Sequence, residues 1–500
     1  MATGKPDRKD LTQGAIGSTL LLFAMPTLAS NILQSLNGSI NAIWVGRFLG
    51  AQALAATANA NIIMFLMFSV VFGFGMASTV VVAQSVGAKD IDAARRAFGT
   101  AVGFCSMLGL GVAIAGWIGA PALLRLLATP QEAFDLALVY LRVIFFAMPA
   151  TLLVVMIMMG LRGAGDARTP LIFMIVSVAI DLVLNPVLIL GLGPVPAFGI
   201  AGSAAATAAA GFISLIGVVA FIYAKDMPLR LRGAELRYLW PAADQMRVLL
   251  GKGLPMGLQM IVMSLSGLVM IGLVNREGLL VTAAYGAAQQ IWTYLQMPAM
   301  AMGAAVSAMA AQNIGAARWD RISRITGYGL GYLLAVTSAM VAVILLFHEP
   351  LLALFLGNNQ AAIAAAWTMQ LLASWSFIFF GCTMILFGVM RANGVVVAPL
   401  LIARGVQNKV LEAMAMARPV VLTPGAATGI EARDGCHFAI APADGAAMLA
   451  RITGLLGDPP RAEAMGQAAR KFVIDEMSWE SVERALSEIL ACAGAPHDAP

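Results

Sequence analysis

The sequence predicts an all-α polytopic membrane protein that is followed by a small soluble α/β fragment. Its 500 residues are 60% hydrophobic and only 11% charged, whereas soluble domains carry roughly a quarter charged residues. Residues 1–400 hold 22 Lys and Arg against 14 Asp and Glu, while residues 401–500 hold 9 against 12. A membrane part with a net charge of +8 is therefore joined to a polar part with a net charge of −3.

Long segments without charged side chains predict the membrane helices. These charge-free segments are 11–46, 48–88, 97–124, 143–161, 253–275, 278–317, 325–347 and 350–390. A further segment, 169–224, contains Asp181 as its one charged residue and is long enough for two helices separated by GLGPVPAFG. Because about 20 apolar residues span a bilayer, we expect ten transmembrane helices.

The charges of the loops predict the orientation of these helices. With the N-terminus inside, the inner loops carry 18 Lys and Arg and the outer loops carry 4, which is the asymmetry of cytoplasmic loops. We therefore expect a multi-pass inner-membrane protein with both termini in the cytoplasm. The basic excess then needs no nucleic-acid partner, and the scattered Cys residues form no metal-binding spacing.

The membrane part contains an internal repeat with an offset near 228 residues. Two motif pairs show it: VVAQSVGAKD (81–90) with MAAQNIGAAR (309–318), and LRGAGDARTPL (161–171) with MRANGVVVAPL (390–400). The first pair aligns Gln84 with Gln312 and Gly87 with Gly315. Because a unit of six helices is even-numbered, the two copies run parallel, and two such bundles around a central cleft are typical of secondary transporters.

The second copy of the repeat is shorter than the first. The first copy continues past Pro170 with two more helices, but the second becomes polar at Arg404 after VVVAPLLIA, and nine apolar residues cannot span a bilayer. We therefore expect two parallel-repeat lobes of six and four helices, with the last two helices missing. The expected ranges are a first lobe at 1–224, a cytoplasmic linker at 225–252, a truncated second lobe at 253–403 and a soluble fragment at 404–500.

Several motifs carry a resemblance to a known transporter family: SINAIWVGRFLGAQALAA, VVVAQSVGAKD, GLRGAGDARTPL with DLVLNPVLILG, and GLPMGLQM. Residues 10–400 resemble the multidrug and toxic compound extrusion (MATE) family of cation-coupled efflux transporters. The resemblance implies export of small amphipathic or cationic compounds by two lobes that open alternately to each side. It implies no cofactor besides the coupling ion; we expect a monomer in the lipid bilayer, impaired by the missing helices.

The polar end of the chain resembles a different family. VQNKVLEAMAMARPVVLT, DGCHFAIAPAD and MSWESVERAL make residues 397–490 similar to the end of the nucleotide-binding lobe of group 1 glycosyltransferases. The resemblance places Glu412 where that family holds the ribose of the donor, with Lys409 in the same motif, whereas Arg404 stands where its partner acid is expected.

This fragment is too small for a complete nucleotide-binding lobe. It has segments for two strands, 419–423 and 437–441, whereas a full nucleotide-binding sheet needs more. The helices expected around them are 404–417, 444–456, 460–476 and 478–491. We therefore expect a folded remnant without glycosyltransferase activity.

Asp181 is the only acid in the middle of a predicted span, about twelve residues into the helix that begins near Thr169. A central carboxylate costs about 2.5–3.5 kcal/mol on insertion scales, and such residues are usually paired or face a cavity. Asn185 lies four residues further on and shares its helix face. We interpret Asp181 as the residue that carries the coupling proton; a structural hydrogen bond between helices is the alternative.

The family resemblance bears on the coupling ion. In the proton-coupled branch, acids occupy the positions that match Asn41 and Asn185, which are amides here. Acids that other branches place on the seventh and tenth helices are replaced by Met263 and by apolar residues around Phe380. The resemblance therefore favours a proton site formed by Asp181, Asn41 and Asn185 over sodium coupling.

Other polar residues inside the spans are candidates for the substrate cleft: Gln34, Asn37, Gln259, Gln289 and Tyr294. Such residues often only bond across helices, which is the alternative for each of them. Arg162, Asp166 and Arg168 lie in a cytoplasmic turn, where we expect a structural clamp.

Two other functions stay open at this stage. One is a membrane-tethered glycosyltransferase, which a complete donor lobe would favour. The other is a flippase of lipid-linked saccharides, which shares this helix plan and which central Lys or Arg residues would favour. The sequence shows neither feature, so an exporter is the preferred interpretation.

Overall fold

The structure of the chain is a computed structural model that describes residues 10–126, 131–191, 196–357, 359–393, 396–398, 407–415 and 417–477. The chain divides into two compact units, Met1–Ala392 and Asn393–Pro500. The first unit is a helical membrane part, and the second is a small α/β part.

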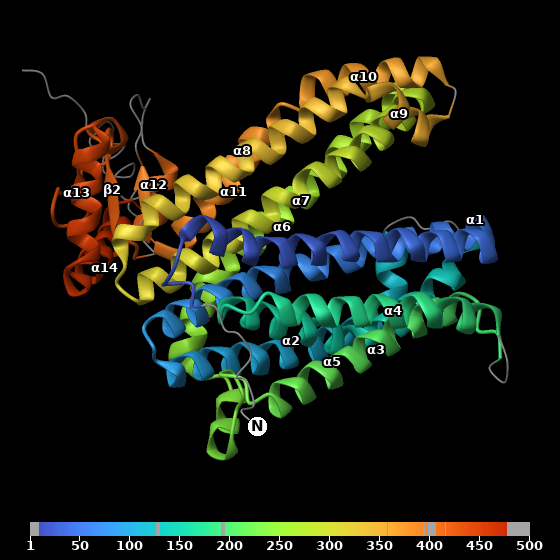
Figure 1. Cartoon of the computed structure of the whole chain (residues 1–500), viewed down its shortest axis with the longest axis horizontal. Coiled ribbons are helices and arrows are strands. Elements are labelled where there is room, and N and C mark those ends of the chain that lie inside the picture. Colours follow the sequence, from blue (N-terminus) through green and yellow to red (C-terminus); the bar gives the residue numbers. More distant parts are fainter. Residues whose placement is uncertain are drawn as a thin grey trace, which may run out of the picture. The chain divides into compact units, whose positions relative to one another are not determined.

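The first lobe is a bundle of long helices (Figure 1). Its helices are α1 (Ile16–Gly87), α2 (Ile91–Leu126), α3 (Gln131–Gly163), α4 (Arg168–Leu190) and α5 (Ile200–Ala224). Helix α1 contains two spans, because the backbone breaks its helical path at Gly50, where φ is 82°. Only glycine adopts such a conformation at little cost. The lobe therefore has six apolar spans, as the sequence predicts.

The second lobe has fewer long apolar helices. Its helices are α6 (Ala243–Val274), α7 (Leu279–Gly315), α8 (Ile322–Leu346), the short α9 (His348–Leu356), α10 (Gln360–Ala373) and α11 (Ser376–Asn393). Helices α10 and α11 meet at a bend of 43°. The described residues hold eight helices with the length and composition of a membrane span, or nine if this bent pair is one span.

Helix α7 accounts for the difference from the ten expected spans. It has 37 residues and no charged side chain. Its Gln and Tyr residues reduce its mean hydropathy, so it is less apolar than the eight helices counted as membrane spans.

Helix α6 is much less covered than its counterpart in the repeat. In the most apolar stretch of Ile16–Gly50 in the first lobe, 44% of the residues are buried, whereas in the most apolar stretch of α6 only 6% are buried. Helix α1 packs against α3 and α4 of its own lobe, while α6 packs chiefly against α1. Its large apolar side chains therefore remain exposed, among them Leu254, Leu258, Val262, Leu265 and Val269.

The segment between the lobes is ordered by contacts with α2. A short 3-10 helix, η1 (Gly233–Leu239), lies there, and Glu235 accepts from Arg95 at 2.7 Å. Tyr238 donates from its hydroxyl to Asp92 Oδ1 at 3.1 Å. Helix α6 then begins at Ala243, so the linker is shorter than the predicted range 225–252.

The second unit contains a parallel sheet in the order β1-β2-β3. The strands are β1 (Val396–Ala398), β2 (Val420–Leu422) and β3 (Ala439–Ile440), with Val396 opposite Val420 and Val421 opposite Ala439. The helices α12 (Asn408–Ala415), α13 (Gly445–Leu456) and α14 (Pro459–Glu476) accompany it. The helix expected at 478–491 lies outside the described residues.

The sequence predicted two strands here, but the described residues form three. Residues 396–398, which we assigned to the apolar end of the second lobe at 253–403, instead form β1 and pair with β2. Consecutive β-branched side chains favour this extended conformation. The division between the units accordingly falls at Asn393, before the boundary expected at residue 404.

Candidate functional site

Asp181 lies inside the first lobe, where it faces other helices rather than lipid. Its side chain is 1% exposed, and that of Asn185, one turn further along α4, is fully buried. The buried positions of α4 repeat at helical spacing, so both residues belong to the face that packs against the lobe. The carboxylate is therefore removed from the membrane hydrocarbon and held among polar groups.

Four side chains donate hydrogen bonds to the Asp181 carboxylate. From α1, Asn37 Nδ2 and Asn41 Nδ2 each lie 2.9 Å from Oδ2. From α4 and α5, Asn185 Nδ2 and Thr207 Oγ1 lie 3.2 Å and 3.1 Å from Oδ1. Asn185 also donates to Asn41 Oδ1 at 2.7 Å. Three helices are thus joined at one acid, and we refer to these five residues as the Asp181 cluster.

The cluster also contains acceptors that are not used. Asn37 Oδ1 and Asn185 Oδ1 are buried and have no hydrogen-bond partner among the residues that the structure describes. Buried polar atoms are usually paired, so two free oxygens beside a carboxylate provide places where a proton donor or a small cation can bind. Among the described residues no group of three or more His, Cys, Asp and Glu could hold a metal ion.

The structure brings together the residues predicted for the coupling site and adds two. Asn37, predicted to line the substrate cleft, bonds directly to Asp181. Thr207 was not predicted, because a Thr in the Ala-rich segment IAGSAAATAAAG carries no signal that separates it from residues that bond to their own helix.

The other predicted cleft residues are dispersed. Gln34 on α1 and Gln289 on α7 are exposed, and Tyr294 is partly buried. Gln259 on α6 accepts a long hydrogen bond of 3.4 Å from Arg391. Contact of any of these residues with substrate remains a prediction.

The second lobe has its own buried polar group, which the sequence did not reveal. Gln370 is fully buried next to the bend between α10 and α11. Its Oε1 accepts from Trp292 Nε1 and from Ser374 Oγ, each at 2.8 Å. Met263, where we looked for an acid, lies on the exposed face of α6.

The repeated glutamines connect the two lobes reciprocally. Gln84 of the first lobe donates to the carbonyl of Ala392 in the second at 2.7 Å. Gln312 of the second lobe donates to the carbonyl of Gly163 in the first at 2.9 Å. Gly163 and Ala392 themselves align in the repeat. The two bonds are therefore the same contact made twice by equivalent residues.

The repeated glycines allow this close approach. A Cβ atom at Gly87 would collide with the backbone carbonyl of Gln312, and one at Gly315 would collide with that of Gln84. Small apolar side chains surround the crossing: Val80, Ala83, Ala310, Ala311 and Ala392, all fully buried. We refer to the two glutamines and two glycines as the interlobe contact; it joins the ends of the lobes that carry the predicted cytoplasmic loops.

Other predicted residues have structural surroundings. Asp166 caps the start of α4, where its Oδ1 accepts from the backbone N–H of Arg168 and of Thr169, both at 3.0 Å. In the second unit, Lys409 and Glu412 both lie on α12. Arg404 lies outside the described residues.

Comparison with known proteins identifies the membrane part. A family model described as MatE matches residues 26–187 and 255–411. The probable multidrug resistance protein YoeA of Bacillus subtilis is 35% identical over 389 residues, which are 78% of this chain and 84% of YoeA. The chain belongs to the MATE family. A second MATE relative, the probable multidrug resistance protein YpnP of Bacillus subtilis, is 31% identical over 386 residues, which are 77% of the chain and 84% of YpnP.

Solved structures show the same fold. A MOP superfamily transporter from Pyrococcus furiosus superposes with a TM-score of 0.71 at 21% sequence identity, over 78% of this chain and 85% of that one. Membership of the MATE family confirms a multi-pass membrane transporter rather than an enzyme. These matches therefore favour the transporter over the alternative of a membrane-tethered glycosyltransferase.

Proposed function

We propose that this MATE protein exports small amphipathic or cationic compounds in exchange for protons, and that Asp181 binds the coupling proton. The observation that carries the proposal is the Asp181 cluster, in which an acid that is 1% exposed accepts four hydrogen bonds within the membrane. Burial of an acid in a span is costly, and ion pathways are the usual reason for it.

The cluster can accommodate both forms of the acid. Four donors satisfy the ionised carboxylate. A protonated carboxyl needs an acceptor, and Thr207 can become one by rotating its hydroxyl, because a hydroxyl both donates and accepts. The unpaired oxygens of Asn37 and Asn185 are further acceptors. Proton binding would then rearrange bonds between α1, α4 and α5, which supports a link between protonation and helix movement.

The test is efflux from proteoliposomes with an imposed pH gradient in sodium-free buffer, with a fluorescent organic cation as the probe. We expect Asp181→Asn to abolish gradient-driven efflux, while Asp135→Asn, which removes an exposed acid of the same lobe, leaves it unchanged. Normal efflux by Asp181→Asn would refute the role of Asp181 and leave only the structural interpretation, in which the carboxylate joins three helices.

Two further efflux measurements identify the coupling ion and test the role of Thr207. Efflux that is driven by a sodium gradient but not by a pH gradient would show that sodium, and not the proton, is the coupling ion. Thr207→Val should slow proton-driven efflux, because it removes the one hydroxyl that bonds to Asp181 within the described part of the chain, and Thr207→Ser should restore it.

For alternating access, we propose that the interlobe contact is the closed cytoplasmic gate. The positive charges of the neighbouring loops support a cytoplasmic position of these helix ends. Alternating access requires the lobes to seal one side at a time, and the reciprocal bonds of Gln84 and Gln312 supply a seal that both lobes form together.

We propose that residues 404–500 are a cytoplasmic glycosyltransferase-like remnant without catalysis. The parallel order of the strands, with α12 between β1 and β2, supports the resemblance. Three strands of two or three residues make too small a sheet for a nucleotide-binding lobe, which supports the absence of activity.

A further inference from the structure

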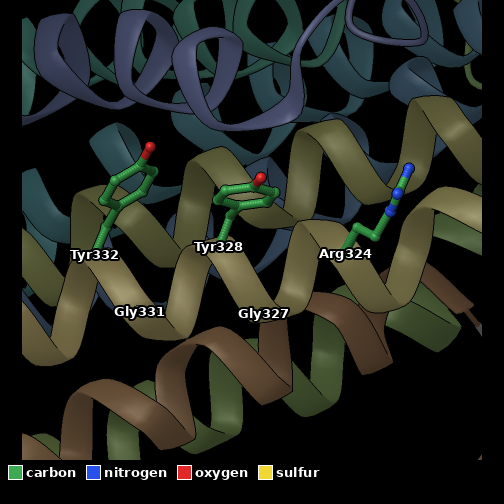
Figure 2. Close-up of a pocket in the computed structure, with 5 residues that line it drawn as sticks. All are labelled: Arg324, Gly327, Tyr328, Gly331 and Tyr332. Atoms are coloured by element: carbon green, nitrogen blue, oxygen red, sulfur yellow. The ribbon is translucent and has the colours of Figure 1, made fainter.

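A shallow groove runs along the face of α8 that is turned toward α1 (Figure 2). It has a volume of about 340 Å³ and is lined by Arg324, Gly327, Tyr328, Gly331 and Tyr332. These positions recur every three or four residues, so they form one stripe of the helix. Figure 2 shows the two tyrosine rings and the Arg324 side chain on the same side of the α8 ribbon, below α1.

The two glycines make the groove. A Cβ atom at Gly327 or Gly331 would meet no other atom within 4 Å, so the space beside them is open and no side chain of the described residues fills it. The tyrosines form its walls, and their edges reach α1, since a Cβ atom at Gly17 would lie 2.6 Å from the Tyr332 hydroxyl. The groove is therefore an open, mostly apolar strip of α8 whose tyrosines lie beside α1.

One end of the groove carries an uncompensated positive charge. Arg324 is exposed and has no hydrogen bond or ion pair with any described residue. Its neighbour Arg318 is paired with Asp320 at 3.2 Å, and Arg321 donates to the backbone carbonyl of Gly14 at 3.1 Å. Charge complementarity thus favours an anion at this end.

The depth of the groove in the membrane indicates which kind of anion fits it. Helix α8 begins at Ile322, so Arg324 lies in its first turn, at the predicted cytoplasmic surface. Tyr332 is eight residues further, which is about 12 Å along the helix, or roughly two fifths of a hydrocarbon core of about 30 Å. A ligand that fits has a negative group at the surface and an apolar chain that descends from it.

We propose that this groove binds an anionic phospholipid of the cytoplasmic leaflet, with its phosphate at Arg324 and an acyl chain over Gly327 and Gly331. Arginine pairs with phosphate through two parallel N–H bonds, and tyrosine is suited to the membrane interface because its ring is apolar and its hydroxyl polar. The bound lipid lies against both lobes, since α1 belongs to the first and α8 to the second.

The test is native mass spectrometry of the full-length protein in detergent, with phosphatidylglycerol and phosphatidylcholine offered in equal amounts. We expect the protein to retain phosphatidylglycerol preferentially. Arg324→Gln should weaken its binding about fivefold, which corresponds to about 1 kcal/mol for one basic residue near the membrane surface. Gly331→Leu should reduce binding of both lipids, because leucine fills the open space.

Matched controls separate the groove from general charge and bulk effects. Arg168→Gln removes an exposed arginine at the start of α4, and Gly272→Leu adds the same side chain to an open position on α6. Both should bind lipid like the parent protein. The proposal is overturned if Arg324→Gln and Gly331→Leu bind like the parent, if the controls lose as much, or if inorganic phosphate displaces the lipid through Arg324.

Discussion

Alanine at Gly315 should prevent the lobes from closing at the interlobe contact. A Cβ atom there would lie 2.7 Å from the carbonyl carbon of Gln84 and 3.0 Å from the backbone nitrogen of Ala88, whereas unstrained carbon contacts are about 3.5–4.0 Å long. Both neighbours are backbone atoms of a helix, so neither can rotate away. The lobes must move apart, and this lengthens the hydrogen bonds of Gln84 and Gln312.

The size of the effect follows from the cost of overpacking. Adding a methyl group to a well-packed contact costs about 1–3 kcal/mol. Since the clash exists only when the lobes are closed on this side, the cost shifts the equilibrium toward the open state. A cost of about 2 kcal/mol changes the ratio of the two states about 30-fold, which should also slow efflux.

Cysteine accessibility measures this shift. Val80 is fully buried at the contact, so Val80→Cys in a background without Cys105, Cys382, Cys436 and Cys492 should react slowly with a maleimide. Adding Gly315→Ala should increase the rate. The matched control is Gly327→Ala, where the same methyl group meets open space. Unchanged labelling and unchanged efflux in Gly315→Ala would refute the closed gate.

Three further predictions concern the second lobe, the soluble unit and the linker. Replacing the residues after Pro399 by two family-like helices should raise efflux and melting temperature, because α6 would gain partners for its exposed face; equal transport by both chains would contradict this. Purified protein should neither hydrolyse nor transfer a nucleotide sugar, and an activity that Glu412→Ala removes would show the opposite. The hydrogen bond from Arg232 lowers the pKa of Asp226. The pair therefore stabilises the folded linker fully at pH values above the ordinary pKa of the carboxyl, about 3.9. This stabilisation is lost as the pH falls through the lowered pKa of Asp226. Melting temperatures of the protein and of Asp226→Asn should therefore differ near neutral pH and converge in acid.

Much of the fold follows from the sequence because a membrane imposes strong local rules. A span needs about 20 apolar residues with its backbone bonds satisfied within the helix, so charge-free segments locate the helices of the first lobe. The same rules make Asp181 conspicuous, since one acid among apolar residues can be recognised without knowing its neighbours. The repeat likewise aligned Gln84 with Gln312 before their contacts were known.

Other features depend on chain segments that are far apart and only meet in the folded protein. Thr207 reaches Asp181 across 26 residues and Asn37 across 144, and no local pattern reports either distance. Val396–Ala398 is apolar enough to begin a membrane helix, and pairing with β2 decides that it is a strand.

The sequence by itself determined where the first lobe's helices lie and which acid is buried among them, because insertion into a membrane is governed by the polarity of each segment. Only the tertiary structure decided what surrounds that acid and how the two lobes meet. Hydrogen bonds such as that of Gln312 with Gly163, and the close approach at Gly87 and Gly315, require atoms of different helices to come within contact distance. Packing of whole helices, rather than the composition of any one, sets that distance.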